Sequence, residues 1–291
     1  MPALSPAAQA VPTHWQCGRF RLSLVRPLVM GILNLTEDSF SDGGRHLDPA
    51  VAISAARQMV ADGADIIDIG AESTRPGART VPPEEEWARL APVLAALAPL
   101  DVPLSVDTRN PGVMREAIAA GASIINDISG FRRAESRDIV ASHTVGLVTM
   151  HMLGDDPATM QANPVYADAC AEVGAFLVQS RQALLDAGVA AERICLDPGF
   201  GFGKTLAHNL ALYEGIATWA GLAPVLIGVS RKSMIGAITG QPVHARLAGS
   251  LAAALAAVQR GARVVRVHDV AETAQALAVW TATGMLAPEG R

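Results

Sequence analysis

Short apolar runs recur along this chain, and polar side chains stand where they end. The runs are rich in Val, Ile and Leu, as buried strands of a parallel sheet are. A charged group inside such a strand is costly to desolvate, whereas at the strand's carboxyl end it faces a shared, partly wet pocket. The pattern therefore predicts a parallel barrel with its polar groups gathered at one mouth. The runs are 29–33, 104–106, 123–125, 194–196, 225–229 and 264–265, and the polar residues are Asn34, Asp107, Asn126, Asp197, Lys232, Arg266 and His268.

Helical signals alternate with these runs. Asp48 and Pro49 offer an N-cap and a first-turn proline, and Gly63 ends the helix that they predict. A second helix opens at Pro83 with three glutamates, which suit the positive end of the helix dipole. Asn110 and Pro111 predict the cap and first turn of a third. Further helices are expected over 137–142, 166–187, 207–219, 245–260 and 271–283.

A weak internal repeat indicates how these units combine. Segments that begin at Gly63, Gly121 and Gly261 each contain a helix stop, a tight turn, two β-branched residues and a polar group. The repeat favours βα units in one closed sheet. A doubly wound open sheet is the alternative, but no Gly-x-Gly-x-x-Gly follows the first strand, and polar strand ends occur along the whole chain. We therefore predict an α/β fold, a (β/α)₈ TIM barrel over residues 27–286, preceded by a tail and short N-terminal hairpin over 1–26 that plugs its bottom.

Composition and charge exclude several classes of partner and site. Half of the 291 residues are hydrophobic, enough for one large core, and the formal net charge is −5. Because no Lys/Arg run exists, we expect neither nucleic acid nor a membrane to be the main partner. Cys17, Cys170 and Cys195 have no metal-type spacing, so buried thiols are expected. With no signal peptide or membrane span recognised, we expect a cytoplasmic protein.

Several strand-end segments carry candidate chemistry. Two glycine-containing polar loops, 34–44 and 70–78, are typical of closure over a ligand. Three glycines with two phenylalanines between them follow Asp197, which suits close approach of backbone and a flat ring. Around Lys232 a strand hands over to a helix that can hold an anion. Arg266 and His268 lie on the same side of their strand and suit phosphate oxygens.

Taken in order, these segments resemble the dihydropteroate synthases of the pterin-binding barrel family. The resemblance covers about 27–271, with two departures: Glu37 replaces the more common proline, and Ala71 replaces a glycine. It rests on Asn34 with Asp38-Ser39-Phe40-Ser41-Asp42-Gly43-Gly44, on Glu72-Ser73-Thr74-Arg75-Pro76-Gly77, Ser105-Val106-Asp107-Thr108, Asn126-Asp127, Asp197-Pro198-Gly199-Phe200-Gly201-Phe202, Ser230-Arg231-Lys232-Ser233 and Arg266-Val267-His268-Asp269.

The resemblance implies a reaction and a set of residue roles. Its members join 6-hydroxymethyl-7,8-dihydropterin diphosphate to p-aminobenzoate, giving 7,8-dihydropteroate and diphosphate for folate biosynthesis, and they are inhibited by sulfonamides. The cofactor implied is Mg²⁺, held by Asn34, with Asp38 joining through water. By the same resemblance, Asp107, Lys232, Arg266 and His268 are catalytic; Thr74, Asp107, Asn126, Asp197, Lys232, Arg266, Val267 and His268 bind pterin diphosphate; and Phe40, Arg75, Pro76, Phe202 and Ser230 bind p-aminobenzoate.

Other residues receive structural interpretations, and other functions remain open. We interpret His151 as a core group, Asp68 and Asp127 as orienting their neighbours, and Lys204 as a mobile surface group. The resemblance implies a homodimer that pairs through late helices. A methyltetrahydrofolate–corrinoid methyltransferase of the same barrel family is an alternative, but it would not need the turn at Lys232. A non-catalytic pterin-binding protein is another, but it would be expected to lose Asp107 or Asn34.

Overall fold

The sheet is a nearly closed barrel of eight parallel strands. The structure, a computed structural model, describes residues 12–35, 49–73 and 79–284. Its strands follow the order β8-β7-β6-β5-β4-β3-β10-β9, and a bridge between Leu196 and Val225 joins the two ends of that row. Neighbours in the sheet are mostly neighbours in sequence, so the predicted barrel is confirmed and the doubly wound alternative is wrong. The barrel strands are β3 (Leu28–Asn34), β4 (Ile66–Gly70), β5 (Leu104–Asp107), β6 (Ile124–Asp127), β7 (Gly146–Met150), β8 (Ile194–Asp197), β9 (Leu226–Ile227) and β10 (Val264–Val267).

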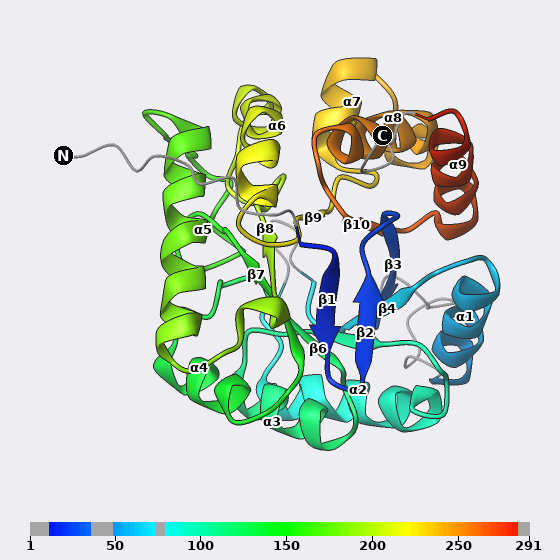
Figure 1. Ribbon diagram of the computed structural model, residues 1–291, viewed down its shortest axis with the longest axis vertical. Coiled ribbons are helices and arrows are strands. Elements are labelled where there is room, and N and C mark those ends of the chain that lie inside the picture. Colours follow the sequence, from blue (N-terminus) through cyan, green and yellow to red (C-terminus); the bar gives the residue numbers. More distant parts are fainter. Residues whose placement is uncertain (1–11, 36–48, 74–78, 285–291) are drawn as a thin grey trace.

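Helices surround these strands as an outer ring (Figure 1). Alternate strand residues such as Leu33, Ile69 and Val106 belong to one large apolar core with helix residues such as Leu90 and Leu94. Burial of this layer supplies the main stabilisation of the barrel. The helices are α1 (Pro49–Ala61), α2 (Pro83–Leu97), α3 (Pro111–Ala119), α4 (Ala134–Ala141), α5 (Ala169–Asp186), α6 (Leu206–Ala220), α7 (Ser233–Thr239), α8 (Leu247–Gln259) and α9 (Val270–Ala282), with short 3₁₀ turns at Ala191–Arg193 and Val243–Ala245.

An N-terminal hairpin of β1 (His14–Cys17) and β2 (Phe20–Ser23) lies across the near end of the barrel in Figure 1. Trp15 and Cys17 are fully buried, and the Trp15 indole donates to the carbonyl of Arg193 at 2.9 Å. They share a second core with the strand residues that begin the interior of the barrel, among them Leu28, Ile66 and Ile124. The hairpin thus closes the amino end of the barrel. The division into segments 1–26 and 27–286 stays a prediction.

Helix boundaries agree with the local signals in most places. Gly63, Gly121 and Gly261 end their helices at φ values of 102°, 99° and 108°, the left-handed conformation that the repeat predicted. Two details differ. The Asn110 side chain makes no cap bond and instead donates to Glu86, and α7, a short helix after Lys232, was not delimited from the sequence.

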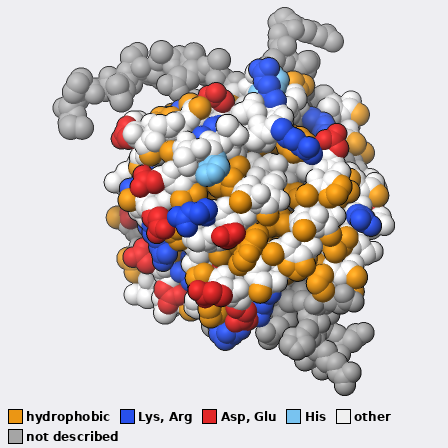
Figure 2. All heavy atoms as spheres, turned by 90° about the horizontal axis from the view of Figure 1, so that it is seen from below, with side chains coloured by type: hydrophobic (Ala, Val, Ile, Leu, Met, Phe, Trp, Pro, Cys, Tyr) orange, Lys and Arg blue, Asp and Glu red, His pale blue; other side chains and the backbone are white. Residues whose placement is uncertain are grey.

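The outer surface carries charges of both signs. On the face formed by the helices at the bottom of Figure 1, acidic and basic side chains are intermingled, with hydrophobic atoms gathered to one side (Figure 2). An exposed ion pair joins α3 to α4, with 3.4 Å between Nη2 of Arg115 and Oε1 of Glu135. Among the described helices, none is both long and apolar enough to cross a membrane.

Candidate active site

The inside of the barrel changes from apolar to polar along several strands. Ile66, Ile124 and Val264 belong to the core against the hairpin, and two residues later on the same strands stand Asp68, Asn126 and Arg266. Residues two apart in a strand point to the same side, so these polar groups face the interior near the carboxyl ends. The register places Asp107 beside Asn126. The mouth predicted from the sequence pattern is therefore present.

Arg266 bridges two carboxylates at this mouth. Its Nε donates to Asp68 at 2.6 Å and its Nη2 donates to Asp107 at 2.9 Å. Asp68 is fully buried, and the other two side chains are less than one-fifth exposed. A guanidinium held by two carboxylates in this way is fixed in position, because its planar fork has few other arrangements.

Asp107 has an unusual ionisation. Burial raises the pKa of its carboxyl to about 7, the Arg266 charge opposes that rise, and the neighbouring Asp68 adds to it. Asp107 therefore titrates close to neutral pH, in the range typical of functional carboxyls.

Asn126 presents a buried acceptor to the mouth. Its Nδ2 lies 3.3 Å and 3.5 Å from the two carboxylate oxygens of Asp68. Its Oδ1 is buried, yet none of the described residues donates a hydrogen bond to it. An unpartnered buried carbonyl costs about 1–3 kcal/mol, so this atom is a candidate contact for a ligand N–H.

The glycine-rich turn 199–203 follows β8, and its residues contact Asp197 and Lys232 at the mouth. Lys232 donates to the Phe200 carbonyl, and its Nζ lies 4.7 Å from the centre of the Phe202 ring. Asp197 is almost fully buried and accepts from the Gly199 N–H at 2.7 Å. Burial lowers the pKa of Lys232 to about 8, while the negative charge of Asp197 raises it. Asp197 and Lys232 thus form the acceptor and donor pair expected of a site for a polar ring.

Lys204 corrects an interpretation made from the sequence. It is buried, not a mobile surface group, with only 5% of its surface exposed. Its Nζ donates to the carbonyls of Gly199 and Phe202 at 2.9 Å and 3.0 Å and contacts Nδ1 of His151 at 2.9 Å. Sequence reasoning missed it because a lysine after a glycine turn is usually solvated; the glycine-rich sequence before it was the available signal.

Ser230 and His268, which follow β9 and β10 in the chain, form another pair of polar groups at the mouth. The Ser230 hydroxyl accepts from the His268 backbone N–H at 3.2 Å and lies 3.1 Å from Nδ1 of the same residue. Val267, between Arg266 and His268, is buried in the layer between strands and helices, so only its backbone can reach a ligand at the mouth. Asp127 accepts from Ser129 and Phe131 and shapes the turn after β6, as expected of an orienting residue.

The remaining predicted site residues divide into two groups. Asn34 ends β3, is half-buried and pairs with Gly70 across the sheet. The described part of the chain contains no cluster of three or more His, Cys, Asp or Glu side chains that could hold a metal ion. Phe40, Thr74, Arg75 and Pro76, and also Asp38, lie outside the described residues.

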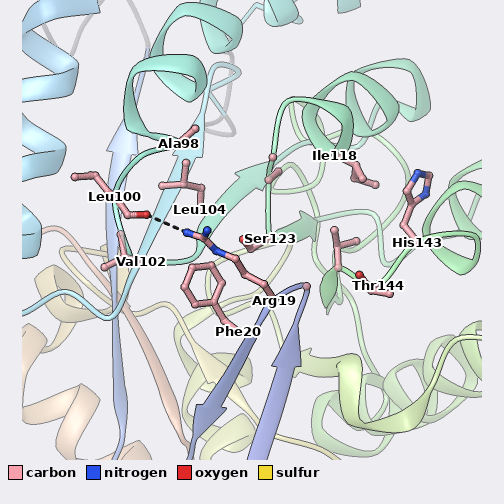
Figure 3. A pocket seen from close by; sticks show the side chains of 14 residues that line it. Arg19, Phe20, Ala98, Leu100, Val102, Leu104, Ile118, Ser123, His143 and Thr144 are labelled. Atoms are coloured by element: carbon pink, nitrogen blue, oxygen red, sulfur yellow. Dashed lines mark hydrogen bonds between the residues drawn. The ribbon is translucent and has the colours of Figure 1, made fainter.

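A cavity of about 440 Å³ lies at the other end of the barrel. Figure 3 shows Arg19 beside Phe20 at the hairpin turn, with the guanidinium directed at the Leu100 carbonyl, which it meets at 3.5 Å. Leu104, Ser123 and Val145 line the cavity, and they stand where β5, β6 and β7 begin. Because barrel chemistry is carried by carboxyl ends of strands, this cavity is not the candidate active site.

Comparison with known proteins adds to this geometry. Residues 30–268 match the family described as pterin binding enzyme. A dihydropteroate synthase of Neisseria meningitidis serogroup C is 50% identical over 277 residues, which covers 93% of this chain and 98% of that protein. The crystal structure of Burkholderia cenocepacia dihydropteroate synthase complexed with 7,8-dihydropteroate is 51% identical, with a TM-score of 0.85 over 96% of this chain and 99% of its own. Xanthomonas albilineans dihydropteroate synthase with 4-aminobenzoic acid is 48% identical, with a TM-score of 0.88 over 94% and 98% of the two chains.

Proposed function

Since this chain belongs to the pterin-binding enzyme family, among the dihydropteroate synthases, we propose that it joins 6-hydroxymethyl-7,8-dihydropterin diphosphate to p-aminobenzoate. The products are 7,8-dihydropteroate and diphosphate, and the reaction is a transfer step of folate biosynthesis. Relatives with bound 7,8-dihydropteroate and 4-aminobenzoic acid support this substrate pair.

The buried, unpartnered Oδ1 of Asn126 is the observation that carries this proposal. A pterin ring has N–H donors and a carbonyl acceptor on one edge. Asn126, Asp107 and Asp197 offer acceptors to such an edge, and Lys232 offers a donor. A polar ring that satisfies several buried groups at once is bound selectively, because an analogue that lacks one bond leaves a buried group unsatisfied.

The chemistry is a substitution at the methylene carbon of the pterin. The p-aminobenzoate nitrogen forms the new C–N bond, the C–O bond to diphosphate breaks, and diphosphate leaves with that electron pair. The nitrogen then loses a proton to solvent. The aryl amine is neutral at pH 7, so its lone pair needs no general base.

The residues of the mouth favour departure of diphosphate. As its C–O bond breaks, positive charge spreads onto the pterin, where ionised Asp107 stabilises it. Arg266 on β10 and His268, which follows that strand directly, are proposed to bind the diphosphate oxygens. Because Asp68 and Asp107 already hold Arg266, its charge is in place before the reaction begins.

Mg²⁺ is proposed as the cofactor, with Asn34 as its protein ligand. The half-buried Asn34 amide at the end of β3 fits this ion, since Mg²⁺ keeps several waters and uses few protein ligands. Diphosphate oxygens would supply the remainder. When bound, the ion would neutralise part of the negative charge on diphosphate.

For p-aminobenzoate, we propose a position against Phe202 with its carboxylate near Ser230. The ring of Phe202 is partly exposed beneath Lys232, and the Ser230 hydroxyl is almost buried beside His268. Phe40, Arg75 and Pro76 are proposed to complete this subsite. A solved relative with a sulfonamide drug supports the further proposal that sulfonamides compete for it.

We propose a homodimer in the cytoplasm. All three cysteines are free thiols, which agrees with a reducing compartment. On the last helices Val258 and Leu277 are buried and serve packing, whereas Ile238 and Val279 are more than half exposed and suit an apolar interface. Light scattering tests the assembly: we expect a dimeric mass that Val279→Asp reduces, and a monomeric wild type would contradict it.

The activity is tested by diphosphate release from 6-hydroxymethyl-7,8-dihydropterin diphosphate with and without p-aminobenzoate. We expect release to depend on p-aminobenzoate and on Mg²⁺, and to be lost in Arg266→Met. Arg263, at the amino end of the same strand, provides the matched control Arg263→Met, which should retain activity. Pterin binding without p-aminobenzoate-dependent release would overturn the synthase proposal.

A further inference from the structure

Asp68 lies at the centre of a buried network below the mouth. Its carboxylate accepts from the Ser105 hydroxyl at 2.5 Å, from Arg266 Nε at 2.6 Å and from the Asn126 amide at 3.3 Å. Asp68 and Ser105 are fully buried, and Asn126 is 3% exposed. These contacts join β4, β5, β6 and β10, so one carboxylate connects four strands of the barrel.

An ionised carboxylate can only accept hydrogen bonds, which fixes the orientation of Asn126. The Asn126 side chain has two ends of similar shape, one a donor and the other an acceptor. Because the end that faces Asp68 must be the donor Nδ2, the acceptor Oδ1 is directed away from Asp68. That Oδ1 is the buried atom for which the described residues supply no donor.

We propose that Asp68 is a positioning residue that sets ligand specificity: by holding Nδ2 of Asn126, it makes the pocket present a carbonyl acceptor. The pocket then selects a heterocycle with an amino group over one with a carbonyl at the same position. This inference rests on the proposed pterin function, and Asp68 itself need not touch the ligand.

Asp68→Asn removes the constraint on the Asn126 amide with almost no change in the shape of residue 68. The new amide keeps an oxygen in the place of Oδ2, which accepts from Arg266, and puts an N–H₂ group in the place of Oδ1, which lies 3.5 Å from Nδ2 of Asn126. Nδ2 of Asn126 then faces a second donor, so Asn126 is no longer held in one orientation. Asn126 can then rotate to present Oδ1 to residue 68 and Nδ2 to the pocket. Ser105→Ala is the matched control, because it removes another bond to Asp68 while leaving both carboxylate oxygens available to Asn126.

Calorimetry with two probes tests the proposal. The probes are 6-hydroxymethylpterin, with a 2-amino group, and 6-hydroxymethyllumazine, with a 2-oxo group in its place. We expect wild type and Ser105→Ala to prefer the pterin, and Asp68→Asn to reduce that preference by about tenfold, the effect of one buried hydrogen bond. In an Asn126→Ala background, Asp68→Asn should no longer alter the preference.

The outcomes distinguish the proposed pterin function from the proposed role of Asp68. Failure of the wild type to bind either probe would contradict the proposed function itself. The role of Asp68 alone would be overturned if wild type prefers the pterin and Asp68→Asn keeps the same preference. If Asp68→Asn does not fold, a crystal structure of wild type with 6-hydroxymethylpterin decides the matter. It must show Oδ1 of Asn126 within hydrogen-bond distance of the 2-amino group, and a longer separation refutes the inference.

Discussion

Nζ of Lys204 lies 2.9 Å from Nδ1 of His151, and this buried pair ties the glycine turn after β8 to the end of β7. Burial, assisted by the positive charges of Lys204 and Arg132, lowers the pKa of His151 to about 3. The imidazole is therefore neutral and accepts a hydrogen bond from Lys204. The same Nζ donates to the carbonyls of Gly199 and Phe202, on either side of the Phe200 carbonyl that Lys232 contacts.

From this arrangement we expect Lys204→Met to loosen the turn beneath Lys232. Three buried acceptors lose their donor, so the free energy of unfolding should fall by about 2 kcal/mol. KM for the pterin substrate should rise, because Phe200 and Phe202 no longer fix the position of Lys232. Urea unfolding and steady-state kinetics measure the two effects, with Arg57→Met on the exposed face of α1 as the control. A normal KM would mean that Lys204 stabilises the fold without positioning the site.

Lys232→Met should weaken pterin binding and leave the fold intact. Loss of a hydrogen bond to a charged group costs about 1.5–3 kcal/mol, which corresponds to roughly 10- to 100-fold in affinity. The methionine side chain retains apolar contact with the Phe202 ring that Lys232 now covers. Calorimetric titration with 6-hydroxymethylpterin measures the change, and unaltered affinity would remove Lys232 from the pterin site.

We expect the pH profile of kcat/KM to have an acidic limb that reflects the ionisation of Asp107. Its pKa is raised to about 7, so the fraction in the ionised form falls as the pH drops below 7. Because the ionised form stabilises the developing cation, kcat/KM should decline by about tenfold per pH unit well below pH 7. Asp107→Asn should lower turnover by a factor on the order of 10² to 10³ and abolish this limb. The exposed Asp101→Asn is the control, and a limb that persists in Asp107→Asn would assign it to another group.

The sequence contains only two lysines, Lys204 and Lys232, and both should make stability depend on pH. Burial lowers their pKa values from 10.5 to about 7 and about 8. Between these values and 10.5 the unfolded chain binds more protons than the folded one, so the free energy of unfolding should rise with pH. Urea unfolding at several pH values between 7 and 10 tests this: the stability of wild type relative to Lys204→Met should increase with pH. A constant difference would contradict the lowered pKa of Lys204.

Local chemistry made it possible to predict the barrel from the sequence. Several strands end in a polar residue because a charge is more easily tolerated there than in the strand interior, as Asp107 and Asp197 illustrate. The helix stops at Gly63, Gly121 and Gly261 are equally local, since a left-handed residue after a helix favours glycine wherever it occurs. Resemblance to a known family, carried by short segments in register, then connected these positions to pterin chemistry.

Only the tertiary structure decided how those polar residues act on one another. Asp68 and Arg266 are distant in sequence, and closure of the sheet brings Nε of Arg266 within 2.6 Å of the Asp68 carboxylate. Lys204 resembled a surface residue because a sequence does not reveal which acceptors will surround an ammonium group. The orientation of the Asn126 amide likewise depends on a carboxylate from another strand. Strand-end chemistry is local and can be predicted, whereas burial, pKa and hydrogen-bond direction arise from contacts between segments that meet only when the barrel closes.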